Sequence, residues 1–92
     1  MAREFGSGWL VDCKFGTIGA ASDKEGGFNL AKAKLDRWNE EIFNDEAYEY
    51  HVEVKDDSEN CMIVTGFYEN KDDEDDSQII RIYITKKDNI VI

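Results

Sequence analysis

The chain has 92 residues, no proline, a hydrophobic fraction of 41% and a formal net charge of −10. This length and apolar content predict one compact domain with a modest core, and they exclude a disordered tail. The acidic balance argues against direct binding to nucleic acid or to anionic membranes, because phosphate groups attract lysine and arginine.

The charge is unevenly distributed along the chain. Residues 1–45 contain six basic and eight acidic residues, a net charge of −2, whereas residues 46–92 contain five basic and thirteen acidic residues, a net charge of −8. A field of this sign speeds encounter with a basic protein. The second half therefore predicts a basic protein partner.

The N-terminal residues resemble cloning sequence. Glu-Phe and Gly-Ser, the dipeptides that two common cloning sites encode, both occur in residues 1–8, which we interpret as a vector-derived tag. Residues 9–92 are expected to form a single α+β domain. No segment resembles a signal peptide, and no apolar run approaches the ~18 residues that a membrane-spanning helix needs, so we expect a soluble, cytoplasmic protein.

One strand and one helix are predicted in the first half. Residues 9–18 alternate in polarity and predict a strand, and residues 19–27 predict a connection, since Gly26 and Gly27 would each weaken a helix by up to ~1 kcal/mol. From Phe28, apolar residues recur at intervals of three and four, which predicts a helix with one apolar stripe. The stripe contains Phe28, Ala31, Leu35, Trp38 and Ile42.

Three or four strands are predicted after the helix. Residues 47–55 and 78–85 alternate in polarity, whereas residues 61–68 are apolar on both faces, which is typical of a central strand. Gly66 indicates a bulge there, and residues 90–92 predict a short last strand. Tight turns favour an antiparallel meander, so the predicted fold is one helix on an antiparallel sheet of four or five strands, in the order β-α-β-β-β(-β).

The residues that could carry chemistry do not form a recognised motif. Cys13 and Cys61 lie within strand-like segments and are expected to be free thiols, with a disulfide as the alternative. His51 lies between Glu49 and Glu53, where a general base could pair with a carboxylate, but no nucleophile motif accompanies it. We therefore expect neither a catalytic site nor a cofactor.

The candidate site is an acidic surface on one strand, one turn and one loop. Counted from Asp72, the sixth and twelfth positions of a calcium-binding EF-hand loop are Ser77 and Tyr83, so we expect no dedicated metal site, and weak divalent-cation binding stays open. The acidic surface contains Glu49, Glu53, Asp56, Asp57, Glu59, Asp72, Asp73, Glu74, Asp75 and Asp76.

The favoured function is a small, non-enzymatic interaction module that binds a basic surface of a protein partner. Inhibitors, immunity-type proteins and nucleic-acid mimics are versions of this function. Acids on alternate strand residues lie ~6.6 Å apart, whereas duplex DNA has one charge per ~1.7 Å, so one strand alone is too sparse for a mimic. Two alternatives stay open. One is a small enzyme or ligand-binding domain with a pocket lined by Tyr48, Tyr50 and Trp38, and the other is a homodimer.

The helix and the order of the elements resemble the cystatin superfamily, in which an antiparallel sheet wraps a helix. The segment LAKAKLDRWN matches the helix signature of plant cystatins at Leu30, Ala31, Lys32 and Asn39, and it departs from that signature at Ala33 and Trp38. The segment from Met62 to Gly66 is similar to the inhibitory Gln-x-Val-x-Gly, but methionine replaces the glutamine and the segment is predicted to lie in a strand. The resemblance implies the fold and does not imply protease inhibition.

Overall fold

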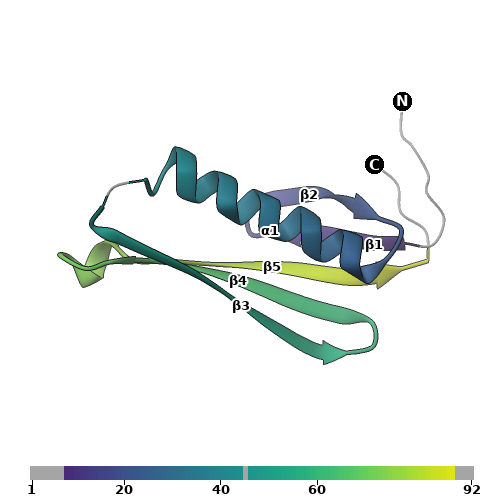
Figure 1. The fold of residues 1–92 in the computed structure, drawn as a ribbon. Helices are drawn as coiled ribbons and strands as arrows, with labels where there is room; N and C mark the ends of the chain where they lie inside the picture. The colour runs from purple at the N-terminus through teal and green to yellow at the C-terminus, as the bar shows by residue number, and fades with distance from the viewer. Residues whose placement is uncertain (1–7, 45, 89–92) are drawn as a thin grey trace.

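A computed structural model describes residues 8–44 and 46–88, except for the side chain of Asp57. The elements are β1 (Gly8–Cys13), β2 (Gly16–Ala21), α1 (Lys24–Glu41), β3 (Tyr48–Ser58), β4 (Cys61–Asn70), the 3-10 helix η1 (Glu74–Asp76) and β5 (Gln78–Lys87). The strands form one antiparallel sheet in the order β2-β1-β5-β4-β3, and α1 lies across one of its faces (Figure 1). The predicted fold class, one helix on an antiparallel sheet, is confirmed.

The N-terminal part contains two strands where the sequence predicted one, so the order is β-β-α-β-β-β. Lys14 and Phe15 form a turn, and the chain reverses at Gly16, whose φ of 120° is readily adopted only by glycine. β1 then pairs with β2 on one side and with β5 on the other. The predicted strand at residues 90–92 and most of the predicted tag lie outside the described residues.

The helix begins at Lys24 rather than at Phe28. The Asp23 carboxylate caps it by accepting a hydrogen bond from the Gly26 N–H at 2.6 Å. Gly27 is buried against the sheet, and a Cβ atom there would lie 2.6 Å from Cγ2 of Ile84. The glycines therefore permit a close approach of helix and sheet, which helix propensity alone does not reveal.

No helix among the described residues is long and apolar enough to cross a membrane.

The core lies between α1 and the sheet. Ala31 and Leu35 of the predicted helix stripe are fully buried, whereas Ile42 lies beyond the helix end and is 59% exposed. The predicted bulge at Gly66 is wrong, because Gly66 pairs in regular register with β3 and β5. Gly66 instead accommodates Leu35, since a Cβ at Gly66 would lie 2.6 Å from Cδ2 of Leu35. The buried core consists of Trp9, Val11, Ala31, Leu35, Val64, Tyr68, Ile80, Ile82 and Ile84.

Two tyrosines, one on β3 and one on β4, connect the sheet to the helix. The Tyr68 hydroxyl donates to the main-chain oxygen of Leu35 at 2.6 Å, and the Tyr50 hydroxyl donates to Asp36 at 2.7 Å. Burial raises the pKa of both tyrosines, and the nearby Asp36 carboxylate raises it further. The hydrogen bonds from Lys32 and Tyr50 hold the pKa of the Asp36 carboxyl below its usual range. β3 is thus attached to α1 although it lies at the sheet margin.

The two cysteines are both free and half-buried. Cys13 ends β1 and packs against the core, whereas Cys61 begins β4. The predicted free thiols are confirmed.

Candidate acidic binding surface

The predicted acidic residues lie at opposite ends of the hairpin formed by β3 and β4. Asp56 and Asp57 lie in the last part of β3 and Glu59 lies in the turn that follows, and we call this region the turn end (residues 56–60). Residues 72–76 lie in the segment after β4, and we call this segment together with the last two residues of β4 the acidic loop (residues 69–77). Because the 11 residues of β3 span about 36 Å, the two groups do not converge (Figure 1).

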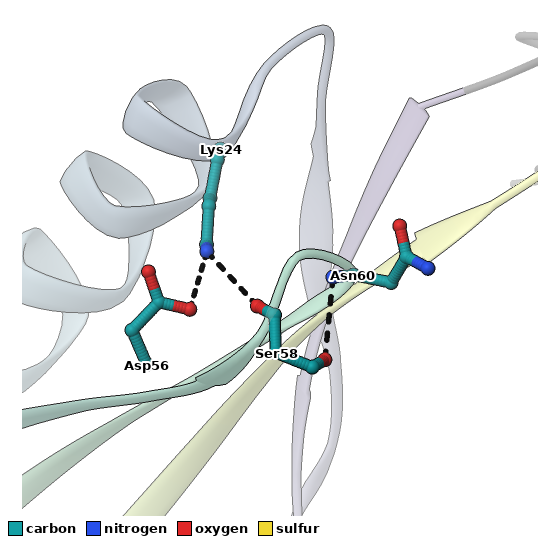
Figure 2. A network of polar contacts seen from close by, with 4 residues as sticks. All are labelled: Lys24, Asp56, Ser58 and Asn60. Atoms are coloured by element: carbon teal, nitrogen blue, oxygen red, sulfur yellow. Dashed lines mark hydrogen bonds and ion pairs between the residues drawn. The ribbon is translucent and has the colours of Figure 1, made fainter.

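At the turn end, a lysine from the helix neutralises part of the charge. Lys24, the first residue of α1, forms an ion pair with Asp56 and donates to the main-chain oxygen of Ser58 at 3.3 Å (Figure 2). The Asn60 N–H donates to the Ser58 hydroxyl at 3.3 Å. Glu59 is exposed. Asp56 therefore fastens the start of α1 to β3, while the side chain of Asp57 lies outside the described residues.

At the other end, Asn70 gives the acidic loop a defined shape. Its side-chain oxygen accepts hydrogen bonds from the N–H groups of Asp72 at 2.9 Å and Asp73 at 3.1 Å. Its side-chain nitrogen donates to Asp76 at 3.1 Å, and its own N–H donates to the Ser77 hydroxyl at 3.0 Å. Within the loop, residues 74–76 form the 3-10 helix η1.

Two of the loop acids, Asp73 and Asp76, are held by neutral groups. Tyr48 and Asn70 donate to Asp76, and these two hydrogen bonds hold the pKa of the Asp76 carboxyl below its usual range. Asp73 accepts from the N–H of Asp75 at 3.1 Å. Hydrogen bonds from neutral donors fix the carboxylates without cancelling their charge. Lys71 is the one basic residue in the acidic loop, against six acids.

The two predicted acids of β3 lie on the face of the sheet opposite α1, which we call the open face. Glu49 is directly opposite Glu69 of β4, and this like-charged pair adds to the field of the acidic loop. Glu53 lies farther along, about 13 Å from Glu49. Its carboxylate is 3.9 Å from Nε2 of His51, whose ring stacks on Phe67 with a centroid distance of 4.5 Å. His51 thus packs on the open face.

The open face also contains apolar side chains beside the acidic loop. Phe67 and Ile79 are directly opposite each other on β4 and β5, and Ile79 is 47% exposed. Together with loop residues they line a depression of about 460 Å³. The sequence-based site omitted both residues, although the pattern of residues 61–68, apolar on both faces, was the signal for them. The depression is lined by Phe67, Glu69, Asn70, Lys71, Glu74, Ser77, Gln78 and Ile79.

The predicted aromatic pocket is formed only in part. Trp38 and Tyr48 line a second depression of about 520 Å³, which also contains Phe15 and Ile42. Tyr50 is not part of it, because its ring stacks on Tyr68 at 5.1 Å. Phe15 is 68% exposed and meets Trp38 edge to face, with a centroid distance of 5.8 Å.

Three further findings concern possible metal ligands, the cystatin-like segment and similar proteins. Within residues 8–44 and 46–88, no three His, Cys, Asp or Glu side chains are grouped so that they could hold a metal ion. The cystatin-like segment from Met62 to Gly66 lies inside β4, as predicted, and not at a hairpin tip. No protein-family model, curated protein or solved structure matches the chain.

Proposed function

We propose that the protein is a cytoplasmic, non-enzymatic interaction module that binds a basic surface of a protein partner. The binding surface is the loop end, which we define as Glu49, Glu69, the acidic loop and the adjoining Phe67 and Ile79. The observation that carries this proposal is the depression in which Phe67 and Ile79 meet Glu69 and Glu74.

The chemistry of this depression suits an arginine or lysine of the partner. The aliphatic stem of such a side chain can pack on Phe67 and Ile79, while its cationic head reaches the carboxylates at the rim. A guanidinium can also bind a carboxylate through two parallel hydrogen bonds and can lie over the Phe67 ring. An apolar centre with a charged rim is the usual composition of a protein interface.

The charge around the depression favours rapid capture of such a partner. The acids of the loop end are not matched by an equal number of basic residues, and hydrogen bonds hold the Asp73 and Asp76 carboxylates and the backbone of the loop in place before binding. A preorganised surface loses less side-chain entropy on binding, and a concentrated field raises the association rate. Occupying a basic surface would also exclude its other ligands, which is how an inhibitor or immunity-type protein acts.

A bait experiment tests the proposal. Three immobilised proteins are exposed to a cell lysate at low salt, and the proteins they retain are eluted with a salt gradient. They are the wild type, the variant Glu69→Gln/Glu74→Gln and the matched variant Glu25→Gln/Glu59→Gln. Each variant removes two negative charges, but only the first removes them from the loop end. We expect basic proteins to elute from the wild type and the matched variant at similar salt, and from the loop-end variant at distinctly lower salt, because screening weakens exposed charge pairs.

Two results would contradict the proposal. One is that the wild type retains no basic protein. The other is that both double variants release the same proteins at the same salt, because retention would then depend on net charge and not on the loop end.

A further inference from the structure

β3 forms an uncovered edge of the sheet. It is the last strand in the order β2-β1-β5-β4-β3, and its 11 residues exceed the 6 residues of β2 at the other edge. α1 packs on β1, β2, β4 and β5 and leaves the outer side of β3 clear (Figure 1). A long edge strand without proline is a template for pairing with another strand.

The direction of the main-chain groups on β3 follows from one hydrogen bond. The Lys71 N–H donates to the Ala47 oxygen at 2.8 Å, so Ala47 and Lys71 form a hydrogen-bonded pair in the antiparallel register of β3 and β4. Such pairs recur at every second residue, so the odd-numbered residues of β3 direct their main-chain N–H and C=O groups toward β4. The N–H and C=O groups of Tyr50, Val52 and Val54 therefore point away from β4. Within the described residues no strand pairs with that side.

We propose that this edge pairs with β3 of a second copy of the chain, antiparallel and with Val52 opposite Val52. The two copies then share one continuous ten-stranded sheet about a two-fold axis. Tyr50, Val52 and Val54 supply about six main-chain hydrogen bonds between the copies. This inference does not depend on the proposed function, although Glu49 belongs to both surfaces.

Charge complementarity selects this register. On the open face, Glu49 of each copy lies opposite Lys55 of the other, and His51 of each copy lies opposite Glu53 of the other. The first pair joins opposite charges and the second joins a carboxylate to an imidazole that can donate a hydrogen bond, both at the closely spaced positions of an antiparallel ladder.

Neighbouring registers lack this match. A slide of one residue would place an outward-pointing main-chain group opposite an inward-pointing one. A slide of two residues places Glu53 opposite Glu53 in one direction and Glu49 opposite Glu53 in the other. A slide of four residues toward the turn restores opposite charges but puts Val52 opposite Asp56, and it enters the irregular part of β3 between Lys55 and Ser58.

The other face and the ends of the molecule agree with the same arrangement. On the helix side, Val52 meets Val52 and Tyr50 meets Val54, which is 49% exposed in the single chain. Because the strands run in opposite directions, the acidic loop of each copy lies beside the turn end of the other, where Lys24 and Lys86 offset part of the charge of Asp56, Asp57 and Glu59. The two acidic loops are thus kept apart.

Sedimentation equilibrium of the full chain from micromolar to millimolar concentration tests the dimer and its register. The wild type is expected to approach the mass of a dimer. Glu49→Lys and Lys55→Glu should each weaken dimerisation about ten-fold or more, since each creates two like-charged pairs, and the double variant should recover most of the affinity. Glu49→Lys is the sharper test, because it makes each copy less negative. It would therefore strengthen association if only the overall electrostatic repulsion between the two copies mattered.

Two further variants separate pairing from misfolding. Val52→Pro removes an outward N–H and leaves the bonds to β4 intact, so it should give a folded monomer. In a Cys13→Ser/Cys61→Ser background, Val52→Cys should form a disulfide-linked dimer on mild oxidation, and Val54→Cys should not, because its two copies would lie about 13 Å apart along the strand. A wild type that stays monomeric at all concentrations would overturn the proposal. So would equal cross-linking by both cysteine variants, or a charge swap that fails to restore the affinity.

Discussion

Acidic side chains lie at both ends of the β3–β4 hairpin, but the groups that hold them differ. At the turn end, Asp56 is bound by the Lys24 ammonium, which cancels its charge and fastens α1 to the sheet. At the loop end, Asp76 is bound by Tyr48 and Asn70, and Asp73 is bound by the main-chain N–H of Asp75. Asp56 thus uses its charge for the fold, whereas Asp73 and Asp76 keep theirs.

This difference explains why composition alone does not locate a binding surface. An acid that is matched by a lysine adds little field, while an acid that is fixed by neutral donors is both ordered and fully charged. The apolar pair of Phe67 and Ile79 lies beside Glu69 and Glu74, which line the same depression. The following substitutions test the comparison, from the largest expected effect to the smallest.

Gly66→Ala should destabilise both ends together, because Gly66 lies in the core that they share. Its new Cβ would lie 2.6 Å from Leu35, and we expect a loss of about 2–3 kcal/mol in the free energy of unfolding. Gly19→Ala is the matched control, since its Cβ would meet Leu30 at an ordinary 3.6 Å. Urea denaturation measures both, and equal stabilities of the two variants would show that Gly66 is not required for the packing.

Asn70→Ala should disorder the loop end while leaving the turn end intact. The variant loses the side-chain bonds to the N–H groups of Asp72 and Asp73, which should lower the free energy of unfolding by about 1–2 kcal/mol. Asn60→Ala at the turn end is the control, because the hydrogen bond there uses the main-chain N–H of Asn60. Amide hydrogen exchange should quicken in residues 71–77 for the first variant alone, and unchanged exchange there would contradict the role of Asn70.

Lys24→Met should loosen the turn end by a smaller amount. A partly exposed ion pair contributes about 1 kcal/mol or less, and salt screens it. The variant should therefore differ from the wild type by less at high salt than at low salt. A double-mutant cycle with Asp56→Asn measures the coupling, and a coupling near zero at low salt would mean that the pair does not tie α1 to β3.

Acid should weaken the loop end through Asp76. The hydrogen bonds from Tyr48 and Asn70 lower the pKa of Asp76 in the folded chain, so their stabilisation is complete above the unfolded pKa of about 4 and is lost as the pH falls through the folded value. Carboxyl-carbon NMR should record a higher pKa for Asp76 in Tyr48→Phe. The same pKa in both proteins would contradict the assigned cause.

The sequence predicts the elements whose periodicity is local. The alternation of Ile80, Ile82 and Ile84 and the helical spacing of Ala31 and Leu35 correctly gave the buried faces of β5 and α1. These patterns hold because a single buried face selects them.

The sequence does not predict features that depend on distant partners. The early start of α1 requires Gly27 to lie against Ile84, and the order of the acidic loop requires Tyr48 to reach Asp76. The separation of the acidic residues into two ends follows from the length of the β3–β4 hairpin. Each of these facts joins residues far apart in the chain, which no local pattern encodes.

An NMR titration with a tetra-arginine peptide tests the central claim, that the loop end is the binding surface, most directly. We predict that amide shifts concentrate at Phe67, Glu69, Glu74 and Ile79, and that they diminish strongly in Glu69→Gln/Glu74→Gln but not in Glu25→Gln/Glu59→Gln. Shifts of equal size at the turn end, or equal losses in the two variants, would contradict the claim.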